Sequence, residues 1–202
     1  VMEALDPQWQ RERFVVPQAQ QIAELLENYK LGVEARRLSG DRRGTTLDLQ
    51  VGASADDGVF YQVSGTYFSS TGTYLFGGKV SGISYESFHR HLGATGIAGS
   101  TIDVSYITYW KQYANQGSAL MKIRAERADA PAAPTTADDG RSRVLTTAGV
   151  DYDSPAGALD TPINTPSLNT VIQELADNQI STVVQMFLLD DGTDYDGRFY
   201  PW

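Results

Sequence analysis

Alternation of apolar and polar residues dominates this 202-residue sequence. Successive side chains of a β-strand point to opposite faces, so a run that alternates in period two predicts a strand with one buried face. A near-continuous apolar run instead predicts a strand buried on both faces, as in the last segment named here. Strands are expected at 45–53, 59–68, 73–84, 100–110, 119–128, 143–150 and 181–191, with the first two paired antiparallel.

Other stretches place apolar residues at intervals of three and four, which is the spacing of one helix face. Helices are expected on this basis at 17–38, 85–96 and 167–178. In the second of these, Tyr85, Phe88 and Leu92 would share a face. Gly93 would then end that helix, because glycine adopts the left-handed conformation common at helix C-termini.

Two long segments lack such periodicity. Residues 128–141 hold two prolines and no large apolar side chain, and residues 151–166 are similarly irregular, so both are expected to be loops. About seven or eight strands with two or three short helices predict a mainly β fold, an antiparallel β-sandwich or single jelly roll. We expect one domain over 1–202, with a helical arm at about 17–38.

Charge is the most informative feature of the composition. The formal net charge is −9, and four lysines stand against twelve arginines, with about twice as many aspartates as glutamates. Such a surface keeps a protein soluble at high salt, where the Debye length falls to about 3 Å at 1 M. It is typical of proteins from halophiles. Direct binding to nucleic acid is not expected, because phosphate binding depends on a surplus of basic side chains.

The absence of cysteine excludes disulfides, thiolate metal sites and a cysteine nucleophile. The chain is expected to be soluble: its longest apolar stretch, 181–189, is far shorter than the roughly 20 residues of a membrane-spanning helix, and no basic-then-apolar leader opens it. Neither observation identifies a function.

Motifs for catalysis or phosphate binding are incomplete. Gly77, Gly78 and Lys79 lie in a strand-like run without the Ser/Thr that a phosphate-binding loop needs, so a glycine bend is the better interpretation. His89 and His91 are the only histidines, and no neighbouring carboxylate spacing completes a metal site. We therefore predict no catalytic residue, no cofactor and no metal.

The segment 190–197 is rich in aspartate. Asp190, Asp191, Asp194 and Asp196 offer the oxygen ligands that calcium prefers, but the order of an EF-hand loop is absent. A solvated acidic turn is the simpler interpretation, and cation binding stays an open alternative.

Aromatic residues are numerous, with eleven tyrosines and three tryptophans. Tyr106, Tyr109 and Trp110 share one predicted strand, and Phe199, Tyr200 and Trp202 end the chain. An aromatic end on such an acidic chain predicts a tail that docks, either on its own domain or on a neighbouring subunit.

The acidic composition, the sandwich pattern, the long proline-containing loops and the aromatic tail together resemble the small single jelly-roll major capsid proteins of tailless icosahedral viruses of halophilic archaea. The resemblance implies a structural virion protein that assembles with itself and a related capsid protein around an internal membrane. It implies no small-molecule substrate. The segments at 17–38 and at the C-terminus would contact other subunits.

Two other functions stay open. One is a tail, spike or carbohydrate-binding module, which would need a solvent-facing aromatic cluster able to stack on sugar. The other is a transferase or hydrolase that uses Glu86, His89 or His91.

Overall fold

A computed structural model describes residues 44–63, 65–71, 74–112, 119–154, 160–180, 182–192 and 196–200. The chain divides into two compact units, residues 1–46 and 47–202, and of the first only residues 44–46 are described. The expected helix at 17–38 and Trp202 lie outside the described residues, so these predictions stay untested.

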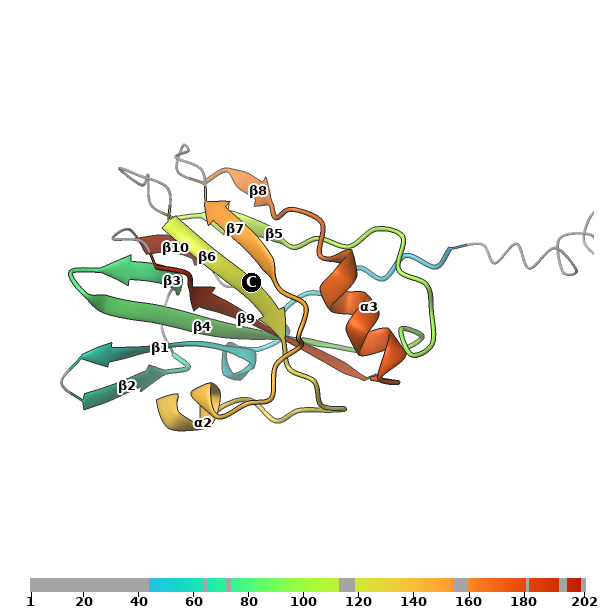
Figure 1. Cartoon of the computed structure of the whole chain (residues 1–202), viewed down its shortest axis with the longest axis horizontal. Helices are drawn as coiled ribbons and strands as arrows, with labels where there is room; N and C mark the ends of the chain where they lie inside the picture. Colours follow the sequence, from blue (N-terminus) through green and yellow to red (C-terminus); the bar gives the residue numbers. More distant parts are fainter. Residues whose placement is uncertain are drawn as a thin grey trace, which may run out of the picture. The chain divides into compact units, whose positions relative to one another are not determined.

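The described part is mainly β, as predicted, and Figure 1 shows its strands with two short α-helices. Every strand pairing is antiparallel. The elements are η1 Ser54–Asp56, β1 Asp57–Val63, β2 Gly65–Ser69, β3 Leu75–Val80, β4 Ile83–Leu92, β5 Thr108–Lys111, β6 Ala119–Ala125, α2 Ala137–Arg141, β7 Val150–Ser154, β8 Pro162–Asn164, α3 Asn169–Asp177, β9 Val183–Asp190 and β10 Asp196–Tyr200.

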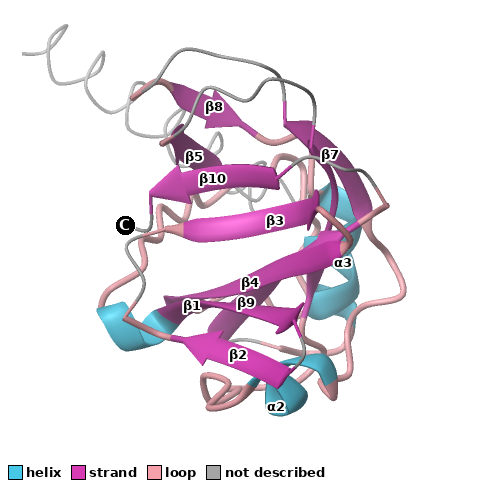
Figure 2. Ribbon diagram, turned by 90° about the vertical axis from the view of Figure 1, so that its left-hand side faces the viewer, coloured by secondary structure: helices cyan, strands magenta, loops and turns pink. Residues whose placement is uncertain are grey.

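The sheet folds into two layers because the long strand β4 belongs to both. The first half of β4 pairs with β3, which continues through β10 and β5 to β8. The second half pairs with β9, which continues through β6 to β7, while β1 and β2 extend the opposite edge. Figure 2 shows β8, β5, β10 and β3 in succession, and we call this the upper sheet. The curled antiparallel arrangement is consistent with a β-sandwich or jelly-roll-like fold.

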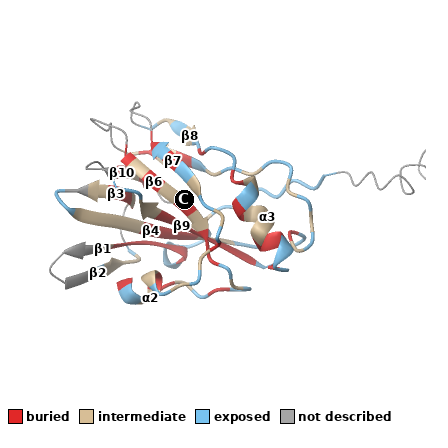
Figure 3. Ribbon diagram, in the orientation of Figure 1, coloured by how far each residue is buried: buried red, intermediate tan, exposed pale blue. Residues whose placement is uncertain are grey.

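The main core lies between the two layers. Leu75 and Phe199 of the upper sheet pack in one cluster with Met121 of β6 and Leu188 of β9. The layers approach closely at Gly77, where a Cβ would lie 2.5 Å from Met121 Sδ. Burial is greatest along β9, consistent with the predicted strand at 181–191 (Figure 3).

A smaller core lies on the other face of β1, β4 and β9. Phe60, Phe88 and Phe187 pack there against Ala137 of α2. Residues 128–136 of the expected loop 128–141 form neither helix nor strand, but the segment ends in α2, whose Ala137 packs in this core. Thr136 caps α2 by accepting a hydrogen bond from Asp139 N.

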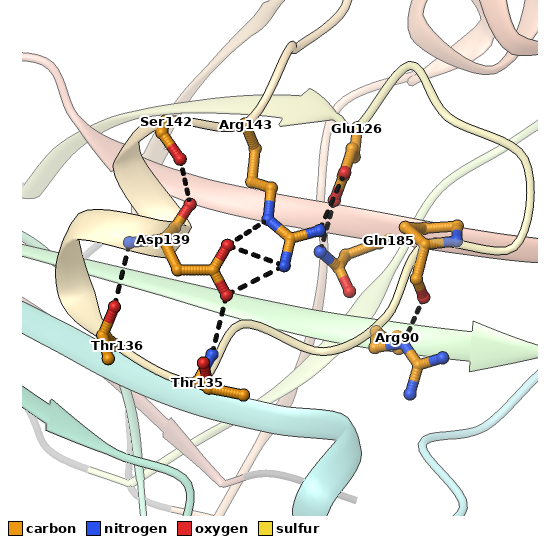
Figure 4. A network of polar contacts seen from close by, with 9 residues as sticks. Arg90, Glu126, Thr135, Thr136, Asp139, Ser142, Arg143 and Gln185 are labelled. Carbon is orange, nitrogen blue, oxygen red and sulfur yellow. Dashed lines mark hydrogen bonds and ion pairs between the residues drawn. The ribbon is translucent and has the colours of Figure 1, made fainter.

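Polar contacts hold this segment in place. The Arg143 guanidinium contacts both Asp139 and Glu126, and the side-chain amide of Gln185 donates to Glu126 at 2.6 Å. Arg90 donates to the carbonyl oxygen of Pro131 at 3.1 Å (Figure 4). Sequence periodicity did not predict this structure, because small residues such as Ala137 carry no hydrophobic pattern.

The helix expected at 85–96 is wrong, since residues 83–92 form β4. Tyr85, Phe88 and Leu92 fit a helical face by spacing alone. In the structure Phe88 points to the smaller core and Tyr85 to the opposite face, as strand alternation requires. Pairing of β4 with β1, β3 and β9 supplies more hydrogen-bond partners than an isolated short helix would.

Strand boundaries also differ from the predictions. Residues 45–53 form no strand, and the run 59–68 instead folds back on itself as β1 and β2. Of the strand expected at 100–110, only β5 forms. The strand expected at 143–150 starts at Val150 and continues to Ser154, inside the expected loop 151–166, which also contains β8.

Several predictions are confirmed. β6 lies within 119–128 and alternates fully between buried and half-buried residues. α3 lies within 167–178 and packs Val171 and Leu175 into the main core. The expected kink near Gly77 and Gly78 is present, since Gly78 has a φ of 100°.

Candidate functional site

A continuous row of aromatic rings crosses the outer face of the sheet. It runs over β2, β1, β4, β3 and β10, and each ring touches the next. We call it the aromatic stripe; its members are Tyr67, Tyr61, Tyr85, Phe76, Tyr74 and Tyr200.

Strand register produces the stripe. Tyr61 is the cross-strand partner of both Tyr67 and Tyr85, so these three side chains share one face. Phe76 lies two residues from Gly78, the partner of Tyr85, and therefore continues the same face on β3. Successive ring centroids lie 4.4, 5.1, 5.7, 6.3 and 5.9 Å apart, the range of favourable aromatic pairs.

The stripe is accessible to solvent. Tyr67 is 45% exposed, and the other five residues are half-buried. Arg198 lies over the ring of Phe76, 5.1 Å from its centroid, which adds a cation–π contact at the centre of the row. Burial raises the pKa of Tyr200, as do the Asp160 carboxylate and Tyr74, so this phenol is neutral at physiological pH. The stripe is thus a largely uncharged, partly apolar surface on an acidic protein.

The two histidines lie on the interior side of β4. His89 Nδ1 is 2.9 Å from His91 Nε2, and His89 Nε2 is 2.7 Å from the Tyr109 hydroxyl on β5. His89 is 1% exposed. A neutral imidazole donates from one nitrogen only, so His89 accepts from one neighbour and donates to the other. We call these three residues the histidine cluster.

Burial keeps the histidine cluster uncharged. It lowers the pKa of His89 well below the usual value, and His91 lowers it further. Burial also lowers the pKa of His91. His91 Nδ1 has no partner of normal hydrogen-bond geometry among the described residues. The Leu49 backbone lies near His91 and opposes the fall in its pKa.

The candidate catalytic residues do not converge. Glu86 points to the opposite face of β4 from the histidine cluster and pairs with Arg141, whose Nε lies 3.0 Å away. Burial raises the pKa of Glu86, and the Arg141 charge and hydrogen bond oppose that change. An acid–base pair made of Glu86 and either histidine is therefore excluded by strand alternation.

The acidic turn is only partly described. Asp190 accepts from the Ser84 hydroxyl at 2.5 Å, and Asp191 and Asp151 both pair with Lys122. The side chains of Asp194 and Asp196 lie outside the description. Among the described residues, no group of three or more histidine or acidic side chains is arranged to hold a metal ion.

Comparison with known proteins identifies no relative: no protein-family model matches the chain, and no curated protein has a similar sequence. Within the described part of the chain, no helix is long and apolar enough to cross a membrane. The aromatic stripe is the candidate functional site.

The sequence prediction missed most of the stripe. It singled out Tyr200 but expected Tyr106, Tyr109 and Trp110 to share a strand, of which only the last two do. Tyr109 is buried in the core, and Trp110 points to the outer face as the cross-strand partner of Tyr200. No local pattern reveals a row assembled from five strands.

Proposed function

We propose that this chain is a structural subunit that assembles with copies of itself or a related protein into a shell such as a virus capsid. The observation that carries the proposal is the aromatic stripe, a row of six rings of which Tyr67 is exposed and the other five are half-buried. Contiguous exposed apolar surface is uncommon on monomeric proteins and marks interaction sites. Tyrosine and phenylalanine are also enriched where protein surfaces meet.

The charge of the chain favours a protein partner over nucleic acid. A net charge of −9 repels phosphates. The guanidinium of Arg198, a basic side chain at the stripe, already packs on the Phe76 ring. Neither of the two best-formed pockets in the described part of the chain is lined by a residue of the stripe. A row of aromatic rings on a sheet face suits another folded surface.

Self-association is the simplest use of such a face, because most protein assemblies are built from symmetric copies of one chain. Two copies with a net charge of −9 each repel one another at low ionic strength. Salt shortens the range of that repulsion, so association through the stripe is expected to strengthen as the salt concentration rises. The acidic composition and the sandwich fold support a virion shell of a halophilic host. Location in the virion, a related partner protein and contact with an internal membrane belong to the same proposal.

Light scattering tests the proposal. The mass of the full chain is measured over about 0.1 to 3 M salt, a range that shortens the Debye length from about 10 Å to below 3 Å. We expect oligomers whose population grows with salt. Tyr67→Ala removes the most exposed ring of the stripe, and about a tenfold higher protein concentration should then be needed for half-association, equivalent to about 1.4 kcal/mol.

Tyr106→Ala is the matched control, because Tyr106 is 55% exposed but lies outside the stripe. It should leave the mass profile unchanged. A wild-type chain that stays monomeric at every salt concentration would contradict the proposal. So would equal losses of association in Tyr67→Ala and Tyr106→Ala.

A further inference from the structure

A second surface feature lies beside α3, away from the stripe. It is an open groove of about 380 Å³ between the segment that precedes β5 and the segment that joins β8 to α3. Its lining includes Asp103, Val104, Tyr106, Asn164, Ser167 and Asn169. The volume falls near the lower end of the roughly 300–1,000 Å³ typical of small-ligand sites. We call it the α3 groove.

Two exposed apolar side chains stand at this groove. Val104 is 76% exposed and Tyr106 is 55% exposed, and they lie two residues apart on an extended segment. Neither side chain belongs to the main core, although the same segment places Ile102 and Ile107 against that core. The Tyr106 ring is therefore available to stack on a ligand.

The walls of the groove are rigid because their polar groups bond to each other. The Ser105 hydroxyl donates to Asn169 at 3.0 Å, and the Asn169 amide donates to the carbonyl oxygen of Asp103 at 2.6 Å. The backbone N–H of Leu168 donates to the carbonyl oxygen of Ser105 at 2.8 Å. These bonds hold the segment 103–105 that leads into Tyr106, so a ligand meets a preformed surface.

Other polar groups remain for a ligand. Asn164 accepts from the Thr108 hydroxyl at 2.8 Å through its oxygen, and its NH₂ group has no partner among the described residues. Asp103 is the only lining side chain that is charged at neutral pH. At the start of α3 the backbone N–H of Asn169 already donates to the Ser167 hydroxyl at 3.4 Å.

We propose that the α3 groove binds a neutral carbohydrate. A sugar ring offers a C–H face for Tyr106 and hydroxyl groups that donate to Asp103 and accept from Asn164. Anionic ligands are disfavoured, because Asp103 would repel them and the lining contains no lysine or arginine. This inference is independent of the assembly function and of the aromatic stripe.

Saturation-transfer NMR on the full chain tests it, with maltohexaose and cellohexaose as the two probes. The pair presents glucose through axial and equatorial linkages, so the groove is offered both chain shapes. We expect transfer to at least one probe at concentrations up to about 10 mM, the range of weak single-site binding. Tyr106→Ala should weaken that binding about tenfold by removing the stacking surface.

Asn164→Asp provides a second, conservative variant. It keeps the acceptor for Thr108 but replaces the NH₂ donor with a carboxylate, so binding should weaken while stability changes little. Tyr67→Ala, on the stripe, should bind the probe as the wild type does. Absence of transfer to both probes would overturn the proposal, as would binding that Tyr106→Ala leaves intact. Because Tyr67→Ala affects assembly and Tyr106→Ala affects sugar binding, either proposal can fail alone.

Discussion

Two groups of aromatic rings meet at β10 and differ in what surrounds them. Phe199 on β10 is fully buried and stacks on Tyr109 and Tyr152, with ring centroids 4.8 and 6.0 Å away. The next residue, Tyr200, points the other way and joins the half-exposed stripe. The comparison teaches that one strand supplies the core from its inner face and the proposed association surface from its outer face, with similar side chains on both.

The largest expected difference between the two faces is in stability. Phe199→Ala should lower the free energy of unfolding by about 3–5 kcal/mol, because it opens a cavity between two packed layers. Tyr200→Ala, one residue away, should cost about 1 kcal/mol or less, since solvent replaces part of the lost contact. Denaturant titration at fixed salt measures both. Equal losses in the two variants would mean that the outer ring is as much a part of the core as the inner one.

The buried group should also make stability depend on pH. His89 and His91 have folded-state pKa values below 6.5, so folding keeps them neutral. Their contribution to stability is complete above pH 6.5 and is lost as pH falls below it, since only the unfolded chain takes up these protons readily. For each histidine that stays neutral in the folded state, the free energy of unfolding falls by up to about 1.4 kcal/mol per pH unit below pH 6.5.

Asp57 acts in the opposite direction. Burial and, to a smaller extent, the adjacent Asp56 carboxylate raise its pKa from 3.8 to about 6. Protonation of Asp57 therefore stabilises the folded state as pH falls through 6, and this gain is complete below 3.8. The two effects partly cancel in the wild-type chain.

Asp57→Asn removes this opposing carboxyl. In this variant the free energy of unfolding should fall steadily from pH 7.5 to 5.5, by about 1–2 kcal/mol in total, as measured by denaturant titration at each pH. Adding His91→Asn should make the decline shallower. A profile of Asp57→Asn that stays level over this range would show that the histidine cluster accepts protons without cost.

The fold class could be predicted from sequence because local patterns suffice for it. β6 alternates in period two and β9 is almost continuously apolar, as their burial requires, and α3 has a helical face. Residues 85–92 of β4 were mistaken for a helix, because Tyr85, Phe88 and Leu92 have helical spacing and only pairing with three other strands decides for a strand.

The candidate sites could not be predicted in the same way. The stripe joins residues from five strands, and its geometry depends on register, such as Tyr61 opposite both Tyr67 and Tyr85. The α3 groove joins the segments around Tyr106 and Asn164, which are far apart in the chain. Tyr106 was noticed, but its predicted place in a strand gave no indication that it would be exposed beside a groove.

The smallest expected effect concerns two buried hydroxyls in the same aromatic group. Tyr109 donates to or accepts from His89 at 2.7 Å, whereas the Tyr152 hydroxyl forms no hydrogen bond of normal geometry with a described residue. Ser154 lies near enough to Tyr152 to oppose the rise in its pKa to about 12, which burial causes. Tyr109→Phe should cost about 1 kcal/mol because His89 loses a partner, and Tyr152→Phe should be neutral or slightly stabilising. Thermal unfolding of both variants at pH 7.5 measures the difference. If Tyr152→Phe costs as much as Tyr109→Phe, the Tyr152 hydroxyl has a partner of similar strength, and the contrast between the two buried tyrosines disappears.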